Sequence, residues 1–220
     1  MKIWKRFGKN MNKNLHRAPS IQQVAIFGFA DCDEDTPLFK SVVETARALA
    51  EAGYVTVNGG GPGVMRAATV GAKIGGGHVI GVTLYPTDMV GFEGRDPQNH
   101  IDIEIKTDTY VERTLTLLKE GQVYVIFNGG TGTLSEFAMA WGMARLYFGH
   151  HKPLILYGKF WKKVMKTLKA NMMIRPQEMK VFKIVNSPEE VLEALQDFEK
   201  EIAEGKHSEI LKTTRNEYSI

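Results

Sequence analysis

The sequence predicts an α/β protein built on a doubly wound, mostly parallel sheet with helices on both faces. From residue 24 onward, short runs of β-branched and apolar residues alternate with longer stretches of helical period. Hydrophobic residues make up 43% of the 220 residues, which is enough to bury a core. Two glycine clusters each follow a strand-like run, at the place where such sheets bind ligands. Together these observations favour a doubly wound α/β fold.

The first half of the chain begins with a strand at residues 24–27. Thr36 and Pro37 then supply cap and first-turn chemistry for a helix that ends near Ala52, where a glycine stops it. The next expected elements are a strand at 54–58, a helix at 64–74, a strand at 78–82, a long loop at 85–99 and a strand at 101–105.

The second half continues the alternation. Residues 123–127 are fully apolar, which predicts a central strand, and the second glycine cluster then opens a helix to about Leu146. The other expected elements are a helix at 110–119, a strand at 153–157, a helix at 161–171, a strand at 182–185 and a helix at 188–204. No linker or repeat divides residues 21–204, so we expect one domain between a basic arm at 1–20 and a tail at 205–220.

Charge is unevenly distributed along the chain. The formal net charge is +3, from 28 Lys and Arg against 25 Asp and Glu. The arm at residues 1–20 holds six basic and no acidic residues, which leaves 22 basic against 25 acidic residues for the rest. Because binding to a phosphate backbone needs basic residues spread over a docking face, this pattern argues against a nucleic-acid partner. A small-molecule ligand is the better expectation.

Cysteine content and hydropathy bear on the cellular compartment. Cys32 is the single cysteine, which excludes an internal disulfide and a cysteine-rich zinc site and fits a reducing, cytoplasmic setting. No apolar run approaches the roughly 18 residues of a membrane span, so we expect no membrane partner. Helix capping and a solvated loop explain the acidic residues at 31–35, so no metal is expected.

The helix that follows Thr133 has almost no polar face. Its apolar residues include Leu134, Phe137, Ala138, Met139, Ala140, Trp141, Met143 and Ala144. Such a helix is expected to be buried on every side. A second subunit is one way to cover it, and we therefore expect a homodimer; the alternative is a central helix of a monomer.

The two glycine clusters are candidates for an anion site. At each, a helix begins, and its first N–H groups have no internal partner while the helix dipole places about half a positive charge beside them. Glycine allows a phosphate to approach the backbone closely. The alternative for either turn alone is a tight structural connection. The candidate phosphate-binding residues are Gly59, Gly60, Gly61, Gly63, Gly129, Gly130, Thr131, Gly132 and Thr133.

Glu136 stands three positions after Thr133, at the start of the helix. One interpretation is a capping box, in which the two side chains satisfy each other's backbone N–H groups. The functional interpretation is a carboxylate held in its ionised form by the helix N-terminus, suited to activate water or to face a growing positive charge. Beside a phosphate site, that chemistry matches cleavage of a glycosidic bond, whose transition state is cation-like at the sugar.

Both clusters resemble the signatures of a known family. The GGxGTxxE signature of the LOG ("lonely guy") family is similar to residues 129–136, and the family's other signature is similar to residues 59–65, Met65 included. Members are nucleoside 5′-monophosphate phosphoribohydrolases, often mislabelled lysine decarboxylases. The resemblance covers roughly residues 22–195. It implies a Rossmann-like fold, usually dimeric, that releases a free base and ribose 5-phosphate from AMP or a cytokinin riboside 5′-monophosphate.

The resemblance also implies a catalytic role for an arginine. In the family, an arginine on the helix before the second signature works with the glutamate, and Arg113 stands at the matching place. An arginine stays protonated, so its implied role is to hold phosphate or to hydrogen-bond the departing base. Without the resemblance, Arg113 would be a solvated helix residue. The chain departs from the family pattern at Phe29, Arg66, Thr114 and Asn128.

Two functions of different classes follow from these residues. The first is a hydrolase without a cofactor, which cleaves the N-glycosidic bond of a nucleoside 5′-monophosphate with Glu136 and Arg113 as catalytic residues. The second is a nucleotide-binding or sensing protein of the same fold without turnover, which the departures at Phe29 and Asn128 favour. Neither glycine cluster has the GxGxxG or GxxxxGK[ST] spacing, so NAD and hydrolysable triphosphates are not indicated.

Overall fold

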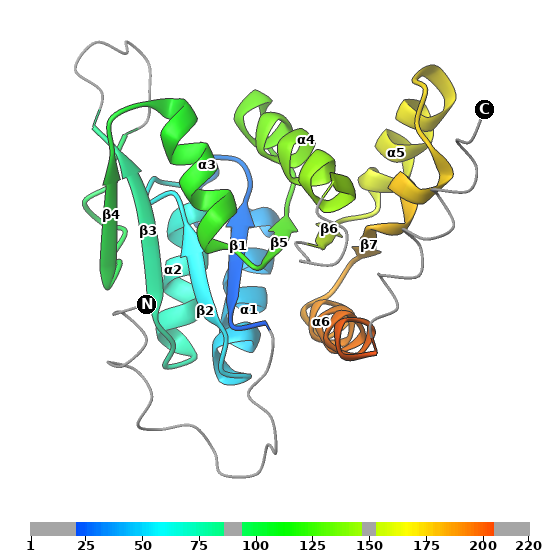
Figure 1. The fold of residues 1–220 in the computed structure, drawn as a ribbon. Helices are drawn as coiled ribbons and strands as arrows, with labels where there is room; N and C mark the ends of the chain where they lie inside the picture. Colours follow the sequence, from blue (N-terminus) through cyan, green and yellow to red (C-terminus); the bar gives the residue numbers. More distant parts are fainter. Residues whose placement is uncertain (1–20, 86–93, 147–152, 205–220) are drawn as a thin grey trace.

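The computed structural model describes residues 21–85, 94–146 and 153–204. The predicted arm and tail, and the middle of the predicted 85–99 loop, lie outside these ranges. In the described part, seven strands form one sheet in the order β4-β3-β2-β1-β5-β6-β7 (Figure 1). Every neighbouring pair of these strands is parallel. The predicted Rossmann-like α/β fold is confirmed.

Strands and helices alternate along the chain, as the sequence predicts. The strands are β1 (Gln23–Phe27), β2 (Val55–Asn58), β3 (Val79–Leu84), β4 (Ile103–Thr107), β5 (Val123–Ile126), β6 (Leu154–Tyr157) and β7 (Phe182–Val185). The helices are α1 (Pro37–Glu51), α2 (Val64–Ile74), α3 (Tyr110–Glu120), α4 (Thr131–Leu146), α5 (Phe160–Asn171), α6 (Pro188–Ala203) and the 3-10 helix η2 (Pro176–Lys180). Among these elements of the described ranges, η2 alone has no counterpart in the expected elements.

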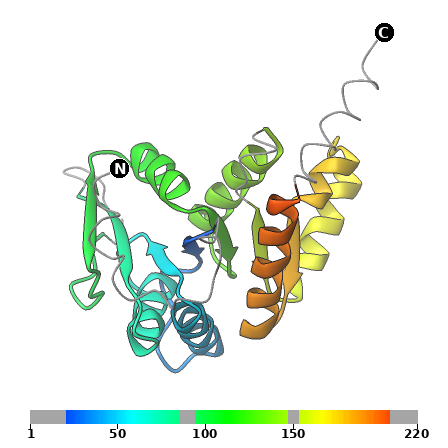
Figure 2. The same cartoon turned by 60° about the horizontal axis from the view of Figure 1, so that its bottom comes forward.

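Two layers of helices cover the sheet, and Figure 2 shows α1 and α2 on one side of the strands with α3 and α4 on the other. Successive residues of a strand point to opposite faces. In β1, Val24 and Ile26 accordingly join the core formed with α1, α2 and α6, whereas Ala25 and Phe27 join the core formed with α3, α4 and α5. Burial on both faces explains why the central strands are apolar throughout.

The chain reverses its direction of travel across the sheet at β1. It passes outward through β2 and β3 to β4, and then returns to place β5 on the other side of β1. Phe27 at the end of β1 pairs with Ile126 at the end of β5, so the two carboxyl ends lie side by side. In open α/β sheets, ligands bind in the crevice outside such a switch point.

An aromatic cluster fixes α4 above this crevice. The ring of Phe137 lies 4.9 Å from that of Trp161 and 5.3 Å from that of Trp141. The indole N–H of Trp161 donates to the carbonyl of Ile126 at 3.1 Å, which ties α5 to β5. Burying one such ring stabilises the fold by about 2 kcal/mol. The position of Glu136, next to Phe137, is therefore set by the core.

The expected strand at 101–105 is shifted, because β4 spans Ile103–Thr107. Alternation of apolar and polar residues locates a strand without fixing its ends. Here the Asp102 carboxylate accepts from the Val79 backbone N–H at 2.7 Å, and Ile103 is the first residue paired with β3, opposite Ile80. Pairing with β3 thus moves the strand two residues along the chain.

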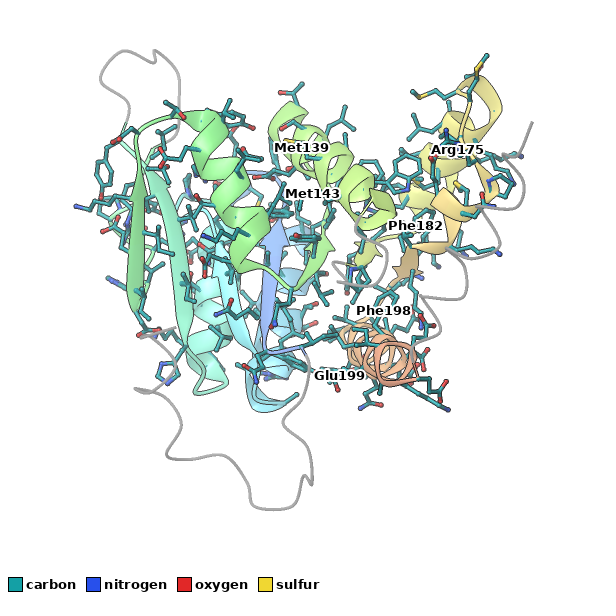
Figure 3. All side chains as sticks on the ribbon, viewed as in Figure 1. Met139, Met143, Arg175, Phe182, Phe198 and Glu199 are labelled. Atoms are coloured by element: carbon teal, nitrogen blue, oxygen red, sulfur yellow. The ribbon has the colours of Figure 1, made fainter. Side chains whose placement is uncertain are left out.

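The apolar helix α4 is covered on one side only in a single chain. Phe137 and Ala140 are buried, whereas Leu134 and Met139 remain 53% and 37% exposed. Figure 3 shows Met139 on this helix. The expectation of a helix buried on every side is therefore wrong for the chain by itself.

Candidate functional site

A cavity of about 270 Å³ opens at the carboxyl ends of β1 and β5. Its walls come from the ends of these strands, the start of α4, the inner face of α3 and the first glycine cluster. The lining residues are Ile26, Phe27, Gly28, Phe29, Ala30, Asp31, Gly59, Met65, Gly94, Tyr110, Arg113, Gly130, Thr131, Gly132, Thr133 and Glu136. The structure thus brings both predicted catalytic residues into one cavity with parts of both glycine clusters.

The second glycine cluster forms the start of α4. The helix begins at Thr131, and the N–H of Leu134 makes its first hydrogen bond, to the carbonyl of Gly130 at 3.0 Å. The preceding N–H groups, of Thr131, Gly132 and Thr133, have no partner one turn back within the helix. All three residues line the cavity. Together with the helix dipole, these donors suit an anion such as phosphate.

The position of the helix start decides between the two interpretations of Glu136. A capping box needs Thr133 as the residue before the helix, but Thr133 lies inside the first turn. Glu136 is therefore one turn into the helix, only 8% exposed, and lines the cavity. The capping-box interpretation is wrong, because the helix begins earlier than the sequence pattern indicates.

Burial dominates the electrostatics of Glu136. It raises the pKa of the carboxyl from 4.5 to about 7, although the positive charge of Arg113 acts in the opposite direction. A carboxylate at a helix N-terminus is expected to be fully ionised at neutral pH. That expectation is wrong for Glu136, because its pKa is raised and not lowered. Desolvation of the buried carboxyl outweighs the neighbouring positive charge. At neutral pH, the group is divided between its two protonation states.

Arg113 is held by the backbone of two elements. Its Nε donates to the carbonyl of Val82 at 3.1 Å, and its Nη2 donates to the carbonyl of Gly59 at 3.0 Å. The side chain is buried, with 6% of the residue exposed. The expectation of a solvated residue, which follows from sequence position alone, is wrong. The guanidinium is a fixed positive charge in the cavity wall.

The first glycine cluster has a different role from the second. A methyl group on Gly59 would lie 1.8 Å from Nη2 of Arg113, so glycine at this position makes room for the arginine. Gly63 has φ of +59°, and a methyl group there would lie 2.3 Å from the carbonyl oxygen of Ala30. Of this cluster, only Gly59 and Met65 line the cavity. Packing of neighbouring loops therefore explains most of these glycines.

The chain after residue 93 clamps the same cluster from outside. The Asp96 N–H donates to the carbonyl of Gly60 at 3.0 Å, and the Asn99 side chain donates to that of Gly61 at 2.8 Å. The carboxylate of Glu104 lies 3.4 Å from Arg95, which also contacts Gly60. Gly60, Gly61 and Gly63, which the sequence places in the phosphate site, lie outside the cavity lining, as does Gly129.

Tyr110 is a lining residue that the sequence reasoning missed. Its hydroxyl lies 3.1 Å from that of Ser135, in a hydrogen bond that links α3 to α4 at the cavity. The signal is the spacing, because Tyr110 and Arg113 are three residues apart on one helix and share a face.

The four departures from the family pattern differ in whether they line the cavity. Phe29 lines the cavity and is 41% exposed. The other three lie outside the lining: Asn128 accepts from the Phe29 N–H, Thr114 bonds the carbonyl of Tyr110, and Arg66 pairs with Glu34 and Asp96. Only Phe29 can therefore touch a bound molecule directly.

These features define a Rossmann-like protein with a helix-terminus cavity and a buried arginine and glutamate beside it. The chain belongs to the SLOG cluster4 family, whose model matches residues 21–192. The LOG resemblance is thereby confirmed at the level of the LOG/SLOG superfamily.

Known proteins show the same kinship. The chain is 29% identical over 138 residues to an uncharacterised protein of Archaeoglobus fulgidus, across 63% of this chain and 85% of that protein. It is 33% identical over 121 residues to the cytokinin riboside 5′-monophosphate phosphoribohydrolase of Mycobacterium tuberculosis, across 54% of this chain and 62% of that protein. The molybdenum cofactor binding protein of Rippkaea orientalis superposes with a TM-score of 0.60 at 25% identity, over 82% of this chain and 99% of that one.

Two further findings concern only the described ranges, which omit 86–93, 147–152 and both ends. Within them, no group of three or more His, Cys, Asp or Glu is arranged to hold a metal ion. No helix in this part of the chain is long and apolar enough to cross a membrane.

Proposed function

We propose that the protein hydrolyses the N-glycosidic bond of a nucleoside 5′-monophosphate, AMP or a cytokinin riboside 5′-monophosphate, to a free base and ribose 5-phosphate. The observation that carries this proposal is Glu136, a buried carboxylate beside Arg113, one turn from the phosphate-type donors at the start of α4. The likeness to a phosphoribohydrolase supports it.

The proposed chemistry uses the Glu136 carboxylate, the Arg113 guanidinium and the N–H groups at the start of α4. The 5′-phosphate binds the N–H groups of Thr131, Gly132 and Thr133. The C1′–N bond breaks with its electron pair leaving on the base, and the ionised Glu136 stabilises the cationic sugar. A water oxygen then bonds C1′ and passes one proton to Glu136. Arg113 hydrogen-bonds the departing base, which takes its proton from solvent.

The proposal is tested by incubating the protein with AMP, GMP, CMP, UMP and a cytokinin riboside 5′-monophosphate and separating free base by chromatography. Release of base from at least one of them, together with ribose 5-phosphate, is the expected result. Absence of any base would remove the hydrolase from consideration.

The rate is expected to depend on the protonation of Glu136. Because the mechanism needs the ionised form and burial raises this pKa to about 7, base release should be slow at low pH and rise through about pH 7 to a plateau. Initial rates from pH 5 to 9 at substrate concentrations well below KM give kcat/KM, which reports the pKa values of the free protein. A rate that falls through the same range would assign Glu136 the role of proton donor instead.

A second function is supported by the likeness to the molybdenum cofactor binding protein and by the exposed ring of Phe29 in the cavity. In this alternative, the cavity binds a phosphorylated ligand and does not turn it over. Thermal stabilisation of the protein by a nucleotide, with no base released during the same incubation, would favour the binding protein.

We also propose that the protein forms a homodimer through α3 and α4. Val111 and Leu115 on α3 are 64% and 50% exposed, and Leu134 on α4 is 53% exposed. Burying such side chains in a subunit interface is favourable. Light scattering of the full chain is expected to give twice the monomer mass. The Leu134→Glu variant is expected to give the mass of a monomer. Lys40→Glu, at an exposed position of α1, is the matched control. A monomeric wild type would contradict the dimer.

A further inference from the structure

Acidic residues are missing from one long part of the chain. No Asp or Glu occurs between Glu136 and Glu178, whereas eight Lys or Arg do. All 25 acidic residues of the protein therefore lie outside this segment. Helix α5 is in its middle and lies at the β7 end of the molecule, away from β4 (Figure 1), with Arg175 a few residues beyond it (Figure 3).

The lysines of this helix gather on one face. Residues spaced by three, four and seven positions share a face of an α-helix. Trp161 and Met165 form the opposite face, which is buried against the sheet. At 1.5 Å per residue, the exposed row is about 15 Å long. We call this row the lysine stripe; it consists of Lys159, Lys162, Lys163, Lys166 and Lys169, all exposed.

The lysine stripe has no counter-charge among the described residues. In the part of the chain that the structure describes, none of its five lysines forms an ion pair with a carboxylate, while Lys73, Lys183, Arg66 and Arg95 each do. The stripe therefore presents its full charge to the surroundings.

This arrangement works against the stability of the helix. Three lysines stand at the N-terminal end of α5, where the helix dipole disfavours cations, and its first turn contains no acidic residue. Like charges four apart on a helix repel each other. Helices α3 and α6 follow the opposite rule, with Glu112 and with Glu189 and Glu190 in their first turns. A local rule broken without compensation among the described residues indicates a function.

An apolar pair lies at the end of the lysine stripe. Met172 and Met173 follow α5 directly, and they are 61% and 106% exposed. Methionine is flexible and adapts to irregular apolar surroundings. Charge and apolar surface are therefore adjacent on this side of the molecule.

We propose that α5 docks the protein onto an anionic lipid surface. The five lysines face the headgroup phosphates and carboxylates, and Met172 and Met173 contact the boundary of the acyl chains. Lipid is favoured over nucleic acid because the exposed Met172 and Met173 add an apolar surface beside the lysines, which a phosphate backbone alone does not require. This proposal departs from the expectation of no membrane partner, which rests only on the absence of a long apolar run in the sequence. This inference is independent of the proposed function.

The test is flotation of the full chain with vesicles of phosphatidylcholine alone and of equal parts phosphatidylcholine and phosphatidylserine. The wild type is expected to float only with the second kind, and less as salt increases. The triple variant Lys162→Gln, Lys163→Gln, Lys166→Gln is expected to bind about a hundredfold more weakly, at about fivefold per lysine. The control Lys40→Gln, Lys119→Gln, Lys200→Gln changes the net charge equally on other helices and is expected to bind like the wild type.

The urea midpoint separates binding from folding. Removing like charges from α5 is expected to leave the midpoint of the triple variant equal or higher, so weaker flotation reflects the surface. A wild type that does not float with either vesicle overturns the proposal. So does a triple variant that floats as well as its control, which would move binding to another part of the chain. Stripe-dependent binding of a DNA duplex without vesicle binding would assign the surface to nucleic acid instead.

Discussion

Replacing Glu136 by Gln is expected to lower the rate of base release by roughly a thousandfold while nucleotide binding stays measurable. The amide fills the space of the carboxyl but carries no charge to stabilise the sugar cation and accepts no proton from water. The phosphate donors at the start of α4 are backbone groups, so the substitution leaves them in place. Single-turnover rates and calorimetric binding of AMP measure the two effects. Glu193→Gln, exposed on α6, is the matched control.

The same variant is expected to be more stable than the wild type at high pH. The pKa of Glu136 is raised in the folded protein, from 4.5 to about 7, so the unfolded chain gives up this proton more easily. The free energy of unfolding therefore falls as pH rises from about 4.5 to about 7, in all by roughly 3 kcal/mol. Glutamine does not ionise and avoids this loss. Urea unfolding should show a much larger gain at pH 8 than at pH 5. An unchanged rate in the activity assay would remove Glu136 from the mechanism.

Replacing Arg113 by Met is expected to damage both stability and activity. The carbonyls of Val82 and Gly59 lose their buried donor, which costs about 3 kcal/mol of unfolding free energy. Without the guanidinium, the pKa of Glu136 rises further, because burial then acts unopposed. Any remaining activity should therefore require a higher pH than that of the wild type.

Urea unfolding and the pH profile of base release measure these two effects for Arg113→Met. The control is Arg47→Met, since Arg47 is half exposed and pairs with Glu51 one turn away. That variant is expected to change stability by less than about 0.5 kcal/mol and to keep the wild-type pH midpoint. An Arg113→Met profile with the wild-type midpoint would show that the two charges do not interact.

The sequence predicts the fold well because period and turn chemistry act locally. Strand β5 and helix α2 are recognisable from apolar runs and flanking glycines alone. The start of α4 is not, since a Thr-x-x-Glu pattern also fits a cap that the chain does not use. Helix η2 is a single short turn whose apolar spacing carries no signal.

The candidate site is predictable in its residues and less so in their roles. Glu136 and Arg113 meet in one cavity, as the family resemblance implies. Local patterns do not show contacts between residues that are distant in the sequence. Residue 59 must be a glycine because the guanidinium of Arg113, 54 positions along the chain, lies where a side chain would be. The protonation of Glu136 likewise depends on how completely the surrounding elements exclude water.

The hydrogen bonds of Arg113 to β3 and to the end of β2 make the position of its charge independent of the shape of the cavity entrance. Arg113 takes its position from the sheet, whereas lining residues such as Phe29 and Tyr110 belong to loops and helix ends. Exchanging those wall residues would alter which molecules fit and leave the reactive machinery intact. A fold of this kind can therefore change its ligand by substitutions in the cavity lining, while the arginine held by the sheet keeps its position.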